Sequence, residues 1–225
     1  NKEGRLESDS RLISFVGDGP DKERQSQPHL HCAEFTPDHK YLLANDLGTD
    51  QIHVFPVSES VSDGVSHSLL NEGESTDIKV EPGSGPRHIC FHPNQKFAYL
   101  INELSGKVTA FSYYRSDLLT LMHHVNFEEF YFQYCESNEN PRWEADGIAI
   151  FAVDSDKGTL TKIGYELTGI HPRNFVITPN GRYLLVACRD SNLIKIFEIN
   201  KETGLLTDTG EKIETSRPVC LKFSY

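Results

Sequence analysis

Short apolar stretches separated by polar turns recur along the chain and predict β-strands throughout. Three segments, 35–55, 91–111 and 177–197, share one pattern: each opens with an apolar residue, any residue and a proline, and each ends on a phenylalanine 18 residues after that proline. The pairs are Pro37 with Phe55, Pro93 with Phe111, and Pro179 with Phe197. Three equal separations without a gap indicate an internal repeat.

Each repeat has the pattern of strand, turn, strand, turn, strand. The second strands are "YLLAN", "FAYLIN" and "YLLVAC", and the third are "QIHVF", "KVTAF" and "LIKIF". Their β-branched and aromatic content, without a period of about 3.6 residues, excludes helices here. The sequences Pro-Asp-His, Pro-Asn-Gln and Pro-Asn-Gly favour type I turns. An outer fourth strand follows in places, as in "GLLTDTGEKIE".

The spacing of the repeats predicts β-propeller blades. Pro37 and Pro93 lie 56 residues apart, whereas Pro93 and Pro179 lie 86 apart, so the second gap holds an additional, degenerate unit that closes at Phe151. Four-stranded units of about 40–50 residues are typical of propeller blades. We therefore predict an all-β fold, a β-propeller of four-stranded antiparallel blades, which forms a single domain over residues 1–225.

About four blades and two partial ends are expected in this chain. The blades lie near 29–70, 86–125, 126–167 and 172–214, the outer strands of another at 1–17, and the first strand of a further one at 217–225. A propeller must close to remove its sheet edges. We therefore expect the chain to be part of a longer protein, or something else to complete the ring.

Charged and histidine side chains occupy equivalent positions of the predicted inner strands, which line the channel of a propeller. Six residues before each aligned proline stand His31, Arg87 and Arg173, and His29 and His88 are close by. A second set stands where the second strands end; its members are Asp46, Asn102 with Glu103, and Arg189. The structural alternative for each residue is a hydrogen bond to backbone or a role in bracing a blade turn.

Taken together, these side chains predict a site for an anion. Arginine is rarely buried without an anionic partner, and two arginines with several histidines suit a carboxylate or phosphate ligand. Beside such arginines Glu103 would stay ionised and could act as a base or orient a water molecule. We predict His31, Arg87 and Glu103 as catalytic residues. The predicted substrate-binding residues are His29, His88, Arg173 and Asp46.

The net charge of −11 argues against a general nucleic-acid or anionic-membrane surface, so the predicted partner is an anionic small molecule held by a local basic cluster. Five cysteines without a CxxC motif are interpreted as buried reduced thiols, which favour a cytoplasmic location. The pair His123–His124 and the stretch "DSDKG" at 154–158 lack a full metal-site pattern. No cofactor is predicted, and no pattern sets an oligomeric state.

Four stretches resemble the seven-bladed propeller lactonase family, which includes the propeller-type 6-phosphogluconolactonases and the carboxymuconate lactonizing enzymes. They are "RQSQPHLHCAEFTPDHKYLLANDLGTDQIHVF", "GPRHICFHPNQKFAYLINELSGKVTAF", "ADGIAIFAVD" and "HPRNFVITPNGRYLLVACRDSNLIKIF". The resemblance implies seven blades in the full fold, of which this chain would lack the first two and the end. It also implies site residues at His29 or His31 in "PHLH", Arg87 in "GPRH" and Glu103 in "NEL".

The implied activity is hydrolysis of a sugar lactone, with 6-phosphogluconolactone, an intermediate of the pentose phosphate pathway, as the leading substrate. One departure bears on it: the family carries "SNR" before "ADGIAIF", whereas this chain has "ESNENPRWEADG", with Glu139 at the arginine position and Arg142 as a possible substitute. Two alternatives stay open. One is a cycloisomerase of the carboxymuconate type, and the other is a non-catalytic propeller that serves as a binding scaffold.

Overall fold

The structure is a computed structural model that describes residues 12–62, 65–70, 72–114, 118–126 and 146–223. Contacts group the chain into two compact units. Unit 1 comprises residues 1–91 and 100–105, and unit 2 comprises residues 92–99 and 106–225. No helix among the described residues is long and apolar enough to cross a membrane.

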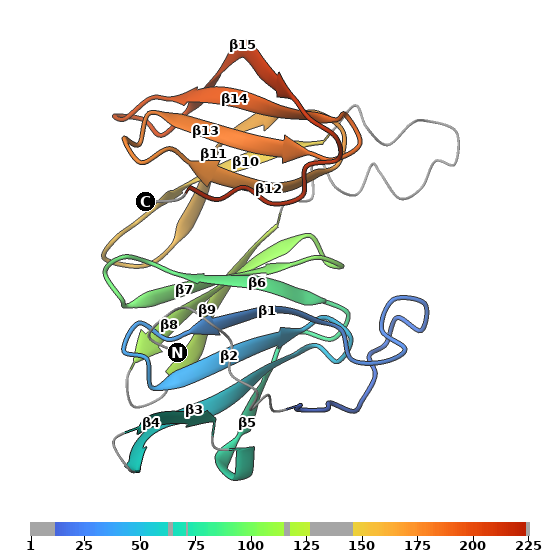
Figure 1. Ribbon diagram of the computed structural model, residues 1–225, viewed down its shortest axis with the longest axis vertical. Helices are drawn as coiled ribbons and strands as arrows, with labels where there is room; N and C mark the ends of the chain where they lie inside the picture. Colours follow the sequence, from blue (N-terminus) through green and yellow to red (C-terminus); the bar gives the residue numbers. More distant parts are fainter. Residues whose placement is uncertain (1–11, 63–64, 71, 115–117, 127–145, 224–225) are drawn as a thin grey trace. The chain divides into compact units, whose positions relative to one another are not determined.

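Unit 1 contains the first antiparallel sheet, in the order β1-β2-β3-β4 (Figure 1). Its strands are β1 (Leu30–Phe35), β2 (Tyr41–Asp46), β3 (Gln51–Ser62) and β4 (Val65–Leu70). After a short 3-10 turn, η1 (Glu72–Glu74), strand β5 (Thr76–Lys79) pairs with the first half of β3, from Gln51 to Val54. The strand beside this half of β3 is therefore β5, which lies after residue 70, where the predicted blade near 29–70 ends.

The remaining described strands form three sheets. One has the order β6-β7-β8-β9, with β6 (Pro86–Phe91), β7 (Phe97–Asn102), β8 (Lys107–Tyr114) and β9 (Leu118–Asn126). The second pairs β10 (Gly147–Val153) with β11 (Leu160–Leu167). The third has the order β12-β13-β14-β15, with β12 (Pro172–Ile177), β13 (Tyr183–Cys188), β14 (Leu193–Ile199) and β15 (Leu206–Glu214). The all-β fold of antiparallel sheets is thereby confirmed: among the described residues two sheets have four strands, the first sheet has β5 as a fifth, and β10 pairs with β11 alone.

The repeated sequence pattern produces a repeated pattern of burial. The closing phenylalanines Phe55, Phe111 and Phe197 are all buried, because each lies on a third strand that faces the core. In unit 1, Leu43 and Ile52 are buried as well as Phe55, and these two residues have no exposed surface. Burial of side chains of this size stabilises a fold by about 1.5–3 kcal/mol each, so the repeat marks the residues that hold each sheet together.

The turns after the first strands also repeat. The amides of His39, Gln95 and Gly181 donate to the carbonyls three residues earlier, at 2.8, 2.8 and 2.7 Å, and these three residues have φ values of 57°, 59° and 67°. Each predicted turn is thus closed by a hydrogen bond whose donor, the fourth residue of the turn, has a left-handed backbone.

A second backbone bond recurs at the other end of each inner strand. The amides of Leu47, Glu103 and Arg189 donate to the carbonyls of His29, Gly85 and His171, at 3.0, 2.8 and 3.1 Å. In each of the three repeats, this bond fixes the segment before the first strand beside the segment that follows the second strand. The side chains at these two places are therefore held at a defined separation.

Candidate functional site

Glu103 lies between two arginines of unit 1. Arg24 Nη2 contacts Glu103 Oε1 at 2.6 Å, and Arg87 Nη1 contacts Glu103 Oε2 at 2.7 Å. The side chain of Arg24 is 51% exposed, that of Arg87 is 23% exposed and that of Glu103 is 17% exposed. The structure therefore brings together two of the predicted catalytic residues, Arg87 and Glu103, and adds Arg24, which the sequence analysis did not select.

Arg87 is placed by its strand and by a neighbouring asparagine. It is the second residue of β6, and its carbonyl accepts a hydrogen bond from Asn45 Nδ2 at 3.3 Å. Asn45 belongs to β2 and is fully buried, so it ties the start of β6 to the first sheet. This bond leaves the guanidinium of Arg87 free to reach Glu103.

Glu103 follows β7 directly, and the loop before β6 fixes it. Its amide donates to the carbonyl of Gly85, which has a φ of 63°. A Cβ added at Gly85 would lie 2.5 Å from Leu104 Cγ, so only glycine allows this approach. Asp50 holds the same loop, because its carboxylate accepts from the amides of Gly83 at 2.7 Å and Gly85 at 2.8 Å.

Arg24 stands on a loop that a buried glutamine anchors. Gln25 has no exposed surface; its Nε2 donates to the carbonyl of Leu47 at 2.8 Å, and its Oε1 accepts from the amide of Asp21 at 3.1 Å. The carboxylate of Asp21 in turn accepts from the amides of Glu23 and Arg24. The sequence signal for Arg24 is its place in the stretch "RQSQPHLH", directly before the glutamine that anchors the loop.

The ion pairs keep Glu103 ionised. Burial alone would raise the pKa of its carboxyl group, but the hydrogen bond from Arg24 and the charges of Arg87, Arg24 and His31 outweigh it, so the pKa lies below its ordinary value. A carboxylate held in this way is a good electrostatic partner and a weak base.

His31 occupies a β-bulge. The register between β1 and β2 passes from Leu30 opposite Asp46 to Cys32 opposite Asn45, which leaves His31 as the extra residue. A bulge redirects the side chain that it carries. His31 is exposed, and it lies close enough to Glu103 for its charge to lower the pKa of that carboxyl group. All three predicted catalytic residues therefore belong to one cluster.

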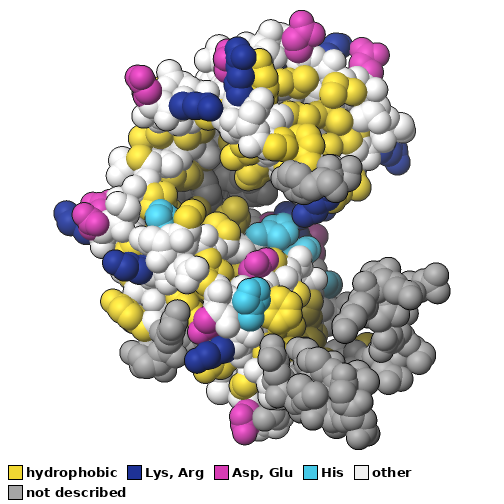
Figure 2. Space-filling view, turned by 60° about the vertical axis from the view of Figure 1, so that its left-hand side comes forward, with side chains coloured by type: hydrophobic (Ala, Val, Ile, Leu, Met, Phe, Trp, Pro, Cys, Tyr) yellow, Lys and Arg dark blue, Asp and Glu magenta, His cyan; other side chains and the backbone are white. Residues whose placement is uncertain are grey.

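The other predicted histidines have different surroundings. His29 is half-buried, and its amide donates to Asp46 Oδ1 at 2.7 Å. His88 follows Arg87 in β6 and is exposed. Figure 2 shows histidine side chains at the surface, beside acidic ones.

Asp46 braces a turn. It has no exposed surface, and its carboxylate accepts from the amides of His29 and Gly48, at 2.7 and 2.9 Å, and from Thr49 Oγ1 at 2.8 Å. His53 Nε2 lies 3.4 Å from Asp46 Oδ2. These partners occupy both oxygens, which favours the bracing role named above as the alternative for Asp46.

His53 links Asp46 to a second carboxylate. Its Nδ1 lies 2.7 Å from Asp77 Oδ1, and the ring of Phe15 packs on it with a centroid separation of 4.4 Å. Burial alone would lower the pKa of His53, but the hydrogen bonds and charges of Asp46 and Asp77 outweigh it and raise the pKa above its ordinary value of 6.5. Protonated His53 therefore stabilises the first sheet.

We predict that this contribution depends on pH. A histidine whose folded-state pKa is raised stabilises the fold fully below its unfolded pKa and loses that effect as the pH rises through the folded pKa. Urea unfolding of the protein and of His53→Gln, from about pH 6 to about pH 9, measures it. The stability difference between the two should shrink as the pH rises, and a constant difference would contradict the prediction.

Arg173 lies in unit 2, at an equivalent bulge. The register between β12 and β13 passes from Pro172 to Asn174 and skips it. Arg173 Nη1 lies 3.3 Å from His171 Nε2, and His171 Nδ1 lies 3.0 Å from Asp190 Oδ2. Arg189 contacts both oxygens of Asp190, at 2.6 and 2.9 Å. The predicted residue therefore belongs to a charged cluster of its own unit.

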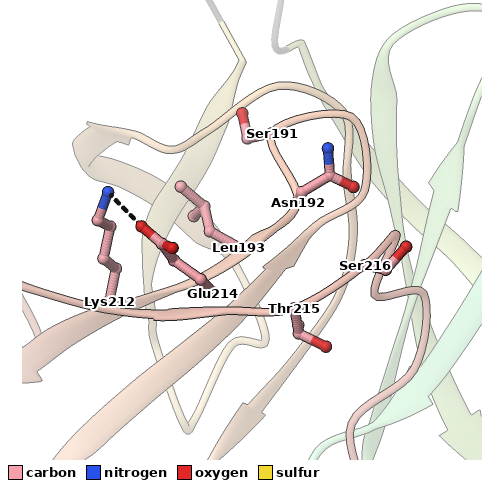
Figure 3. A pocket seen from close by; sticks show the side chains of 7 residues that line it. All are labelled: Ser191, Asn192, Leu193, Lys212, Glu214, Thr215 and Ser216. Carbon is pink, nitrogen blue, oxygen red and sulfur yellow. Dashed lines mark ion pairs between the residues drawn. The ribbon is translucent and has the colours of Figure 1, made fainter.

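A surface cavity of about 540 Å³ in unit 2 contains none of the predicted site residues (Figure 3). Its lining residues are Ser191, Asn192, Leu193, Lys212, Glu214, Thr215 and Ser216. Its polar groups serve the backbone: Ser191 Oγ accepts from the amide of Ile170 and Asn192 Oδ1 from that of Arg217, while Lys212 pairs with Glu214. We therefore do not assign the site to this cavity.

Glu139 and Arg142, which concern the departure from the family pattern, lie outside the described residues. Among the residues that the structure does describe, no three His, Cys, Asp or Glu side chains are grouped as a metal site would require.

Comparison with known proteins finds similarity to lactonases. A family model described as lactonase, seven-bladed β-propeller, matches residues 1–130 and 134–223. A 6-phosphogluconolactonase of Formosa agariphila is 38% identical over an alignment of 218 positions, which covers 90% of this chain and 60% of that protein.

Solved structures similar to this chain are also named as lactonases. A candidate 6-phosphogluconolactonase of Bacteroides fragilis is 49% identical, with a TM-score of 0.80, over 95% of this chain and 62% of that one. The periplasmic gluconolactonase of Pseudomonas aeruginosa is 25% identical, with a TM-score of 0.76, over 94% of this chain and 61% of that one. The chain thus spans about three fifths of the length of these relatives.

Proposed function

Because the chain belongs to the seven-bladed β-propeller lactonase family, we propose that its protein hydrolyses a sugar lactone. The leading substrate is 6-phosphogluconolactone, which would yield 6-phosphogluconate. The observation that carries the proposal is the cluster in which Arg24 and Arg87 hold Glu103. It combines positive charge for an anionic substrate with a carboxylate for water activation.

The proposed reaction adds one water molecule across the ring ester. Glu103 or His31 takes a proton from water as the oxygen attacks the lactone carbonyl carbon. Arg87 stabilises the negative charge that develops on the carbonyl oxygen. The bond between this carbon and the ring oxygen then breaks, and the ring oxygen leaves as a hydroxyl group with the proton returned by the base. The product is an open-chain hydroxy acid.

Arg87 suits the stabilising role because of its surroundings. Its Nε is buried and has no hydrogen-bond partner among the described residues, while its Nη1 holds Glu103. A buried, unpaired donor costs free energy in the resting protein, and such groups are found at functional sites. Arg173, the equivalent residue of a later repeat, stays a predicted substrate-binding residue.

The test is hydrolysis of 6-phosphogluconolactone by the protein, measured above the spontaneous rate. We expect activity in the protein, loss in Arg87→Ala, and unchanged activity in Arg182→Ala, a control whose exposed side chain pairs with Glu198 at 3.1 Å. A folded protein without activity would contradict the proposal and favour the scaffold alternative. Carboxymuconate in the same substrate panel tests the cycloisomerase alternative.

We also propose a cytoplasmic location. The prediction of buried thiols is correct for Cys188 and wrong for Cys90 and Cys220, which are exposed, while Cys32 is half-buried. All four of these thiols are free, which fits a reducing compartment. The gluconolactonase of Pseudomonas aeruginosa is periplasmic by its name, so the alternative location is the periplasm. Cell fractionation followed by immunodetection decides between the two.

A further inference from the structure

The two arginines that hold Glu103 differ in how firmly they are placed. Arg87 belongs to a strand, is largely covered, and has its carbonyl bound by the buried Asn45. Arg24 stands outside every strand, and half of its side-chain surface is exposed. Its backbone is nevertheless fixed through Asp21. The side chain of Arg24 can therefore rotate away from Glu103 about a fixed backbone, whereas that of Arg87 is more covered and has a buried Nε.

The cluster carries more positive than negative charge. Two guanidinium groups face one carboxylate, and His31 lies nearby, in a chain whose net charge is −11. An excess positive charge in an otherwise acidic protein attracts an anion locally. A phosphate or carboxylate presents two oxygens in the geometry that a guanidinium binds best, so it competes with Glu103 for an arginine.

We propose that Arg24 is a specificity-determining residue: the anionic group of the substrate pairs with Arg24 in place of Glu103. When the phosphate or carboxylate of the substrate pairs with Arg24, Glu103 retains only Arg87 and becomes free to accept a proton. This inference rests on the proposed lactone hydrolysis and goes beyond it, because it links recognition of the anion to activation of the base. A neutral lactone would leave Glu103 held by both arginines, and its hydrolysis would stay slow.

Arg24→Gln separates this role from a structural one. With 6-phosphogluconolactone we expect kcat/KM to fall about 10–100-fold, the effect of losing a hydrogen bond to a charged group. With unphosphorylated gluconolactone we expect no loss, or a gain, because Glu103 is then released in every molecule. Arg182→Gln, at an exposed ion pair, is the matched control. Equal losses on both lactones would overturn the proposal.

A second measurement does not need turnover. Carbon-13 NMR of labelled glutamate follows the ionisation of Glu103, with Glu103→Gln to assign its signal. Inorganic phosphate should raise the pKa of Glu103 in the protein and leave it unchanged in Arg24→Gln. No response to phosphate in the protein would overturn the inference. A response that requires Arg24, in a protein that hydrolyses no lactone, would support the anion exchange and contradict the proposed reaction.

Discussion

Replacing Glu103 with glutamine is expected to lower kcat/KM for lactone hydrolysis by about 10²–10⁴-fold, the usual contribution of general acid–base catalysis. Glutamine has the same length, and its single amide oxygen can accept a hydrogen bond from one of the two arginines that hold the carboxylate oxygens at 2.6 and 2.7 Å. It cannot take a proton from water. The fold should survive, and the loss should appear in kcat more than in KM.

The control for this experiment is Glu198→Gln, because Glu198 also pairs with an arginine, Arg182, at 3.1 Å, but on an exposed surface. It should leave the kinetics unchanged. If Glu103→Gln retained full activity, Glu103 would not be the base, and the same substrate should then be tested with His31→Gln.

The same variant should change the stability in acid. The folded-state pKa of Glu103 is lowered, so its ionised form stabilises the fold above the unfolded pKa, and this effect disappears as the pH falls through the folded value. Glu103→Gln lacks this contribution, so its stability deficit should shrink on acidification.

Replacing Asp46 with alanine is expected to lower the free energy of unfolding by about 3–5 kcal/mol, as for the loss of one partner from a buried charged network. The change leaves the amides of His29 and Gly48 and the hydroxyl of Thr49 without their acceptor inside the protein. It also leaves His53 with Asp77 alone. Urea unfolding at neutral pH measures the effect.

Asp208→Ala is the matched control, because Asp208 is 44% exposed and its bond with Lys195 is a surface ion pair. Such pairs contribute about 0–1 kcal/mol. If Asp46→Ala remained as stable as this control but no longer bound substrate, Asp46 would be a ligand-binding residue and not a brace.

The repeat and its strands could be predicted from the sequence because they depend on local patterns. The closing phenylalanine 18 residues after the proline places Phe55, Phe111 and Phe197 on third strands, where all three are buried. Turn residues and strand residues act over short distances, so their pattern is legible without a fold. The blade boundaries stay a prediction.

The structure of the site depends on long-range contacts, which the sequence does not display. Arg24 and Glu103 are 79 positions apart, and their contact requires the anchored loop of Gln25 and the approach of Gly85 to Leu104. The bulge at His31 is likewise a matter of strand register. The sequence also left two roles open for Asp46, because a buried brace and a ligand-binding acid are the same residue type in the sequence.

The recurring backbone bond between the segment before each first strand and the segment after each second strand has an evolutionary consequence. It joins Leu47 to His29, Glu103 to Gly85, and Arg189 to His171 through main-chain atoms alone. Side chains at these positions can therefore be exchanged by mutation without altering the framework that presents them, except at Gly85, where the φ of 63° and the contact with Leu104 require glycine. Gene duplication within such a fold supplies several equivalent positions, and new substrate preferences can arise in one blade while the others preserve the old one.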